Sequence, residues 1–543
     1  MGLTPSPTRL SSVEQLMPRT YVRQMFCFPT THPQAVAILR RGITALVLEI
    51  PYILARVVRE EESGLLALSG PCQRPEDVFS SGDLSVSTFT FASISYAKLK
   101  AENFPPAAFL HPDIIPSDTV LPLPDEPAVF RARASVVAGG GLILCVAMHH
   151  AVTDITGLGS LLKVWASCCR GEIPSETIGF SEDWMDRTPL FAYSDCHSSR
   201  KRHELHSDDE VPDLLHIRTG AIEDVLKKEK MDTEIYKTAI FYFPDRYLRY
   251  LKDAVNAHLR DYSLFEPNSW VSTGDVLTSL LWSAVAIEVA TPKAHLRNDL
   301  TLDPEPGAST AGARNIENDS RVDSRLSFPV QFRPILHSHS DPSLKRLPKD
   351  FLGAAFVMTS ADVSEELLRR LVNSATDTET IIILATIALA IRRSIQAIDD
   401  DAVRRVLAYL EEATMNRHSL TSHDNSPQVV LGRSRKPTLP NGKGNGSAVT
   451  VVSWAGQEIY NLPWGPELGQ CEAVRLPKMR ARRDPVILPR HVTSGGSQGG
   501  GPNLRDGGDT DGLEVIMSYE DAAMERLIEC PLMKRFAVLR CLS

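Results

Sequence analysis

Apolar residues recur at two different spacings in the first part of the chain. Between Val36 and Ile50 they recur every three or four positions, which predicts an amphipathic helix that ends before Pro51. From Val129 to Val137 apolar and polar residues alternate, whereas Leu142–Met148 is apolar on both faces. These two runs predict a β-hairpin that turns at Gly139–Gly141, with its second strand buried in the middle of a sheet.

A change of composition divides the chain into two predicted domains. Residues 194–211 are polar and charged, and an apolar strand is predicted soon afterwards, from Tyr236 to Phe243. We therefore place the boundary near residue 230, with an N-terminal domain over 1–230 and a C-terminal domain over 231–543. Segments rich in Gly, Ser, Asn, Asp and charge are predicted to be mobile surface insertions of the C-terminal domain, near 301–323, 416–447 and 493–512.

Composition narrows the range of functions. The 543 residues are 43% hydrophobic, enough for large buried cores, and the net charge of −9 disfavours nucleic acid or an anionic membrane as a partner. The longest apolar run, Ile381–Ile391, is shorter than the ~20 helical residues that span a bilayer. Nine cysteines without a CxxC pair are typical of a reduced chain. We expect a cytoplasmic protein with neither a membrane nor a nucleic-acid partner.

The sharpest local pattern follows the predicted buried strand. Residues 149–154, His-His-Ala-Val-Thr-Asp, lie between that strand and a helix predicted from about Gly157 to Cys169. A histidine at a strand end can project into a cleft with one nitrogen free as a general base, and a carboxylate four positions later can hold the turn. Because this spacing also occurs often by chance, the spacing alone favours a buried structural histidine.

Other motifs reverse that preference. HHAVTDITGLG (149–159) resembles the HHxxxDG signature of the BAHD-like acyl-CoA-dependent acyltransferases, in particular the fungal branch that includes trichothecene 3-O-acetyltransferase. Further segments are similar to the family's motifs in order and spacing from about residue 10 to 535: LSSVEQLMPRTYVRQMFCFP (10–29), STGDVL (272–277), FPVQFR (328–333), DFLGAA (350–355) and YNLPWG (460–465).

The resemblance implies a fold, a reaction and a set of site residues. It implies an α/β monomer of the chloramphenicol-acetyltransferase-like fold, in which two domains with mixed sheets meet along a channel. His150 would be the general base that transfers an acyl group, most simply acetyl, from acyl-CoA to a hydroxyl of a fungal-type secondary metabolite. Asp154 would complete the catalytic motif as a structural partner of Arg333, at the end of the FPVQFR strand. Further structural support would come from Gly157, Trp464 and Gly465. Acyl-CoA would be a cosubstrate, with no bound cofactor and no metal, and no residue that contacts it is assigned.

Three departures from the family pattern leave a narrowed activity open. Ile155 replaces a glycine, although Gly157 and Gly159 are expected to restore the flexibility of that turn, and Ala354 replaces the asparagine of the family's YxGN turn. YNLPWG keeps only the last two residues of the family's DFGWG element. Two other functions stay open. One is a condensation-like enzyme that uses a carrier-protein thioester, because that superfamily shares the HHxxxD motif. The other, left open by the weak YNLPWG element, is a non-catalytic homologue that binds a small molecule. The intact HxxxD motif disfavours the second.

Two further patterns are weak. Gly495–Gly499 fits the GxSxG nucleophile motif, but it lies in a glycine-rich stretch that predicts no strand before it and no helix after it. Cys196, His197, His203 and His206 match no known spacing of a structural zinc site. We interpret both segments as surface loops.

Overall fold

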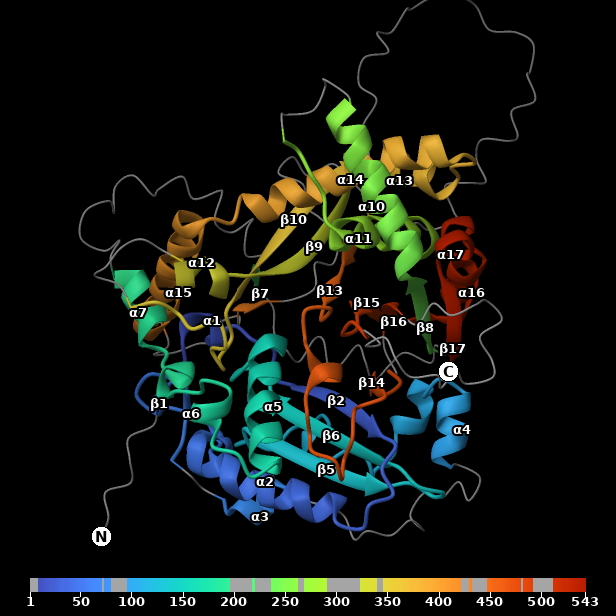
Figure 1. Ribbon diagram of the computed structural model, residues 1–543. Helices are drawn as coiled ribbons and strands as arrows, with labels where there is room; N and C mark the ends of the chain where they lie inside the picture. Colours follow the sequence, from blue (N-terminus) through green and yellow to red (C-terminus); the bar gives the residue numbers. More distant parts are fainter. Residues whose placement is uncertain are drawn as a thin grey trace, which may run out of the picture.

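Two large apolar cores organise the protein. The computed structural model describes residues 8–70, 73–79, 95–195, 217–219, 236–261, 268–290, 323–338, 345–420, 429–431, 447–479, 482–491 and 511–543. One core lies among the blue and teal elements in the lower part of Figure 1, and the other among the green to red elements above them.

The first core lies against a four-stranded sheet. The strand order is β14 (Ala473–Arg475), β2 (Tyr21–Phe28), β6 (Leu142–His149) and β5 (Phe130–Val136), and each described pairing is antiparallel. The predicted hairpin is confirmed as β5 and β6, which are joined by three glycines with positive φ. All residues of β6 are buried between its two neighbours, which explains why its sequence is apolar on both faces.

Helices cover both faces of this sheet. α2 (Ala35–Glu49) and α5 (Ile155–Cys169) pack against each other and against the face that carries Phe26 and Leu144. α4 (Tyr96–Ala101) packs on the opposite face, where Met25 and Cys145 contribute to a smaller core. α2 ends before Pro51, as its apolar spacing predicted.

The second core draws on two mixed sheets. One has the order β13 (Val452–Ser453), β15 (Arg483–Ile487), β16 (Gly512–Glu520), β8 (Tyr236–Pro244) and β17 (Val538–Leu542), and the other β10 (Phe356–Ser364), β9 (Asp323–Gln331) and β12 (Ala448–Thr450). They are mixed because β13 runs parallel to β15, and β12 parallel to β9. The helices of this core are α10 (Asp245–Asp261), α11 (Thr273–Val285), α13 (Glu365–Val372), α14 (Asp377–Gln396), α16 (Asp521–Glu529) and α17 (Pro531–Phe536).

The two other described sheets are small. A three-stranded sheet contains β1 (Thr8–Arg9), β4 (Leu66–Leu68) and β3 (Val57–Arg59), and β11 (Val429–Leu431) pairs with β7 (Ile217–Thr219). The remaining α-helices are α1 (Ser12–Gln15), α3 (Pro75–Val78), α6 (Pro174–Thr177), α7 (Thr188–Asp195), α12 (Arg333–Ser338) and α15 (Asp400–Leu420).

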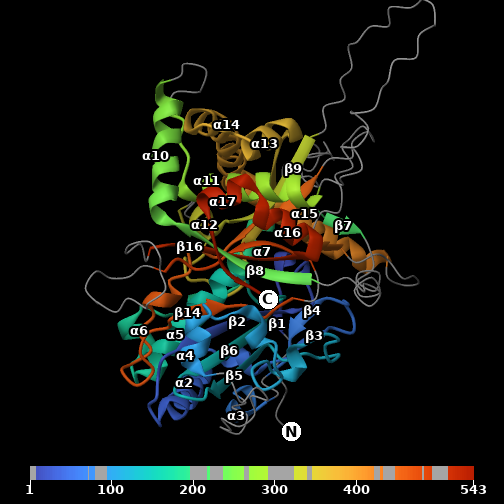
Figure 2. The same cartoon turned by 90° about the vertical axis from the view of Figure 1, so that its right-hand side faces the viewer.

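Late segments of the chain return to the first core. β14 pairs with β2, and Figure 1 shows this orange strand beside the blue and teal strands. Leu336, Phe351 and Val403 are buried in the same core. Figure 2 likewise shows β14 beside β2 of the N-terminal sheet. The boundary near residue 230 stays a prediction, since it lies outside the described residues, but the first core is not built from residues 1–230 alone.

Several sequence interpretations concern residues outside the described ranges. They include the GxSxG pattern at 495–499, the cysteine and histidines between 196 and 206, and most of the three predicted insertions. Among the described helices, none alone combines the length and apolarity of a membrane span. The bent pair α14 and α15 passes that test together, and α14 contributes many of its apolar residues to the second core.

Candidate active site

His150 lies in the turn that follows β6. Its backbone N–H donates to the carbonyl of Thr20 at 2.8 Å, and its side chain is half-buried. Its ring Nδ1 lies 3.1 Å from the carbonyl oxygen of Thr153. Because a carbonyl oxygen can only accept a hydrogen bond, Nδ1 carries the proton of the neutral ring and Nε2 carries the lone pair. The backbone of the turn therefore selects the tautomer that a general base needs.

The environment keeps this ring neutral. Burial lowers the pKa of His150 below its ordinary value, against the smaller opposing effects of the Thr153 carbonyl and the Asp154 carboxylate. A ring with a lowered pKa is unprotonated at neutral pH and can accept a proton.

His149, the last residue of β6, has a different environment. Its side chain is 1% exposed and packs edge-on against Tyr21, with ring centroids 5.4 Å apart. Its Nδ1 accepts the backbone N–H of Ala151 at 3.2 Å, and burial lowers its pKa to about 3. This side chain is part of the core, so the geometry supports the choice of His150 as the base.

Asp154 is the N-cap of α5 and receives five hydrogen bonds. Its Oδ1 accepts from the backbone N–H groups of Thr156 at 3.0 Å and Gly157 at 2.9 Å, and its Oδ2 from that of Ala355 at 2.9 Å. Arg333 donates to both oxygens, each at 2.8 Å. Burial by itself would raise the pKa of Asp154, but Arg333 and these hydrogen bonds hold it below its usual value. The ionised carboxylate is thus fully engaged in holding the turn.

Arg333 joins two turns of the chain. It is 1% exposed, and its guanidinium also donates to the carbonyls of Phe351, at 3.1 Å, and Gly353. The predicted contact with Asp154 is confirmed as a bidentate pair. One detail of the prediction was wrong: β9 ends at Gln331, and Arg333 is the first residue of α12 and not the end of the strand.

Two of the departures from the family pattern leave these contacts intact. The 351–355 turn hydrogen-bonds to the ion pair through backbone atoms, so these contacts do not depend on an asparagine side chain at position 354. The methyl group of Ala354 is buried in the first core. Ile155 begins α5, and its carbonyl accepts from the side chain of Gln457 at 2.7 Å. Neither contact requires the residue that is usual in the family.

Gly157 supports the site by close packing. An added Cβ would lie 2.3 Å from the carbonyl oxygen of Leu352 and 2.4 Å from Oγ1 of Thr153. We expected this glycine to give the turn flexibility, but it lies within α5 and instead lets the helix approach the 351–355 turn.

The YNLPWG element contributes Tyr460, Leu462 and Trp464 to the first core. Trp464 is 1% exposed and contacts Trp165 and Phe28 edge-on, with ring centroids 5.6 and 5.8 Å apart. Gly465 has a φ of +100°, which side-chain-bearing residues rarely adopt. Both observations fit the structural role predicted for these residues.

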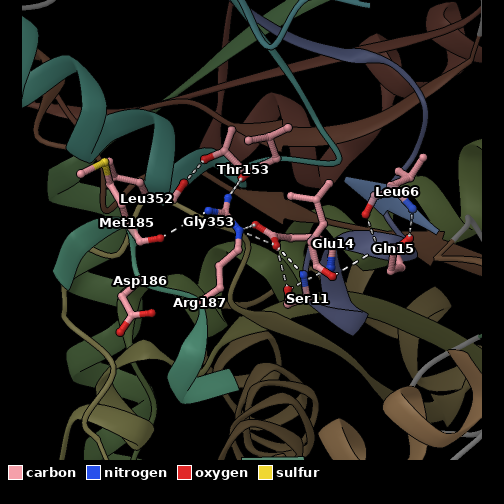
Figure 3. Close-up of polar contacts among 12 residues, drawn as sticks. Ser11, Glu14, Gln15, Leu66, Thr153, Met185, Asp186, Arg187, Leu352 and Gly353 are labelled. Atoms are coloured by element: carbon pink, nitrogen blue, oxygen red, sulfur yellow. Dashed lines mark hydrogen bonds and ion pairs between the residues drawn. The ribbon is translucent and has the colours of Figure 1, made fainter. Parts of the chain in front are cut away.

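The family motifs assigned no role to three residues in or near the histidine turn: Thr153, Glu14 and Arg187. The carbonyl of Thr153 holds the ring of His150, and its Oγ1 donates to the carbonyl of Leu352 at 2.7 Å. Glu14 and Arg187 form a second buried ion pair next to this turn (Figure 3). The spacing of Ser11 and Glu14 is that of a capping box, which indicates a helix start, but nothing nearby in the sequence indicates the partner. Within the described ranges, no group of three or more His, Cys, Asp and Glu residues is placed to hold a metal ion.

Comparison with known proteins confirms the resemblance. Residues 20–169, which include the histidine turn and α5, match the family described as the trichothecene 3-O-acetyltransferase-like N-terminal domain. This stretch belongs to that family. The O-acetyltransferase ptmV of Penicillium ochrochloron is 24% identical to the chain, across 97% of this chain and 96% of that relative.

Solved structures confirm the predicted fold. TRI101 of F. graminearum, complexed with coenzyme A and T-2 mycotoxin, superposes with a TM-score of 0.66 at 16% identity, covering 98% of this chain and 99% of that one. Vinorine synthase superposes with a TM-score of 0.51 at 13% identity, covering 98% and 94%. These superpositions show that the chain shares the fold of both proteins across 98% of its length.

Proposed function

We propose that this trichothecene acetyltransferase-like protein is an acyl-CoA-dependent acyltransferase that O-acetylates a hydroxyl of a fungal-type secondary metabolite, terpenoid or polyketide-derived. The observation that carries the proposal is the half-buried, neutral ring of His150, whose Nδ1 is held by the Thr153 carbonyl so that Nε2 is the base. The similarity to a named O-acetyltransferase, and to a protein that binds coenzyme A, supports the same reaction.

In the proposed reaction, Nε2 of His150 accepts the proton of the acceptor hydroxyl while that oxygen attacks the thioester carbonyl of acetyl-CoA. The tetrahedral intermediate then collapses, the carbon–sulfur bond breaks, and the imidazolium returns the proton to the coenzyme A thiolate. This transfer needs no covalent acyl-enzyme, and the acceptor hydroxyl has to lie within about 2.6–3.2 Å of Nε2.

Asp154 and Arg333 act on the geometry of the base in this scheme. Their hydrogen bonds fix the start of α5, the 351–355 turn and therefore the Thr153 carbonyl that orients the ring. Because one chain supplies both partners and the histidine, we propose that the protein acts as a monomer.

The proposal is tested with purified protein, acetyl-CoA and a panel of terpenoid and polyketide alcohols, with free thiol release followed by a chromogenic reagent and the products by mass spectrometry. We expect thiol release that depends on the alcohol and a product heavier by one acetyl group. Transfer only from an acyl carrier protein would favour a condensation-like enzyme. Tight binding of a panel compound without transfer would favour a non-catalytic homologue.

A further inference from the structure

A buried ion pair between Glu14 and Arg187 lies against the turn that carries His150 (Figure 3). Nε of Arg187 lies 2.9 and 3.1 Å from the two carboxylate oxygens of Glu14. The Glu14 side chain is fully buried, and the same carboxylate accepts from the backbone and hydroxyl of Ser11 at 2.8 and 2.9 Å. α1 therefore presents a fixed negative charge to Arg187.

The two terminal nitrogens of Arg187 donate to backbone carbonyls, and its guanidinium lies over the Tyr52 ring, 5.6 Å from the centroid. Its Nη2 donates to the carbonyl of Val152 at 3.4 Å, and its Nη1 to the carbonyl of Met185 at 3.3 Å. Val152 lies between His150 and Thr153, whose carbonyl holds the histidine ring. Arg187 therefore contacts the peptide chain that sets the tautomer of the base.

The segment around Arg187 also holds the 351–355 turn. The backbone N–H of Leu352 donates to the carbonyl of Trp184 at 2.7 Å, and the Leu352 carbonyl accepts from Thr153 Oγ1. A Cβ added at Gly353 would lie 2.7 Å from a carboxylate oxygen of Glu14. Two buried ion pairs, Glu14–Arg187 and Asp154–Arg333, thus contact the same two turns.

We propose that Glu14 and Arg187 are positioning residues for catalysis, which hold the backbone at 150–153 so that the Thr153 carbonyl keeps Nδ1 of His150 protonated and Nε2 aimed at the acceptor. The inference rests on the proposed function. A merely structural role is the alternative. It is weakened by the general observation that an apolar replacement of a buried ion pair is often at least as stable, so that such a pair is a poor device for stability alone.

The variants Glu14→Gln and Arg187→Met separate positioning from simple electrostatics. Removing the negative charge of Glu14 would by itself lower the pKa of His150, and removing the positive charge of Arg187 would raise it. Loosening of the turn would instead admit water in both variants and raise the pKa of His150 toward its ordinary value. Asp154 and His149, the other titratable groups beside the ring, are unchanged in both variants.

The pKa of His150 is measured by NMR on protein labelled with ¹³C at the histidine ring, with the signal assigned by its loss in His150→Gln. We expect the pKa to rise in both variants, and kcat with acetyl-CoA and a turned-over alcohol to fall about ten- to hundredfold while KM for acetyl-CoA changes little. Arg187→Lys keeps the charge but has a single ammonium group in place of the fork, so we expect it to restore kcat only in part.

Arg392→Lys is the matched control. Arg392 donates from Nε to the buried carboxylate of Asp275 at 2.8 Å, in the second core and away from the histidine turn. We expect it to lower the melting temperature while leaving the His150 pKa and kcat at their wild-type values. Equal effects of this control on kcat would overturn the positioning role, as would His150 pKa shifts of opposite sign in the two test variants. The NMR titration needs no turnover. A wild-type protein that acylates nothing would refute the proposed function, while the His150 pKa in the two variants would still test whether the ion pair holds the turn.

Discussion

Removing either partner of the Asp154–Arg333 ion pair should strongly lower the free energy of unfolding, and removing both should lower it little further. In Asp154→Ala, the buried guanidinium keeps only the carbonyls of Phe351 and Gly353, and three backbone N–H groups lose their acceptor. Leaving one charge of a buried pair without its partner costs about 3–5 kcal/mol, and the lost N-cap adds about 1 kcal/mol. We therefore expect the free energy of unfolding to fall by about 4–6 kcal/mol.

Arg333→Ala should lower the free energy of unfolding by less, about 3 kcal/mol, because the Asp154 carboxylate keeps its three backbone N–H donors. If the two side chains acted independently, the double variant would lose roughly 7–9 kcal/mol, the sum of the two values. Because the pair is bidentate and buried, we expect the double variant to lose about as much as Asp154→Ala alone. The coupling free energy would then be about 3 kcal/mol, at the upper end for residues in contact.

The assay is urea unfolding at pH 7, followed by tryptophan fluorescence and by far-UV circular dichroism, with turnover of the same samples measured from thiol release. Asp154→Asn and Arg333→Lys form a second cycle for use if an alanine variant does not fold. Losses that add to within about 0.5 kcal/mol would refute a coupled pair. Full turnover in a folded Asp154→Ala protein would refute its role in holding the histidine turn.

Three further predictions follow from the same geometry. His150→Ala should lower the rate of acyl transfer about 10²–10⁴-fold without loss of coenzyme A binding, whereas His149→Ala should mainly lower the melting temperature; the opposite result would make His149 the base. Gly157→Ala should destabilise the protein by about 1–3 kcal/mol in urea unfolding and lower turnover, because its Cβ meets a backbone carbonyl. Gly159→Ala should be tolerated, because its Cβ would lie 3.4 Å from the Gln457 side chain, at an ordinary van der Waals distance. Since the lowered pKa of His150 favours the neutral base, kcat/KM should rise with pH through a midpoint below 6.5 and be level at neutral pH; a midpoint above 7 would contradict this.

The sequence predicted the local elements of the site well. The continuous apolar run of β6 and the alternation in β5 indicated a hairpin with a buried central strand, because each pattern reports the environment of residues close in the chain. The order of the motifs led to the contact between Asp154 and Arg333, although the resemblance to a family, and not the spacing, supplied that pairing.

Local sequence patterns could not predict the contacts between distant segments. Nothing near Glu14 marks it as the partner of Arg187, and nothing near Ala473 marks it as the strand partner of Cys27. Gly157 shows the same limit, since a glycine close to a turn suggests flexibility until the Leu352 carbonyl is seen to occupy the space of a side chain. In each case the deciding neighbour comes from a remote part of the chain.

The two buried ion pairs couple the chemistry of the turn to the assembly of the whole chain. Asp154 reaches a charge at the start of α12, and Glu14 on α1 reaches Arg187 beyond α5, so no short segment can form the site. Each pair is desolvated, which makes it a strict condition on geometry, since one misplaced partner leaves a buried charge uncompensated. The Thr153 carbonyl lies between the two pairs along the turn, at the point where it sets the tautomer of His150. Displacing either pair should therefore disturb the base before it unfolds either core, because the sheets on both sides are held by apolar contacts that do not involve these charges.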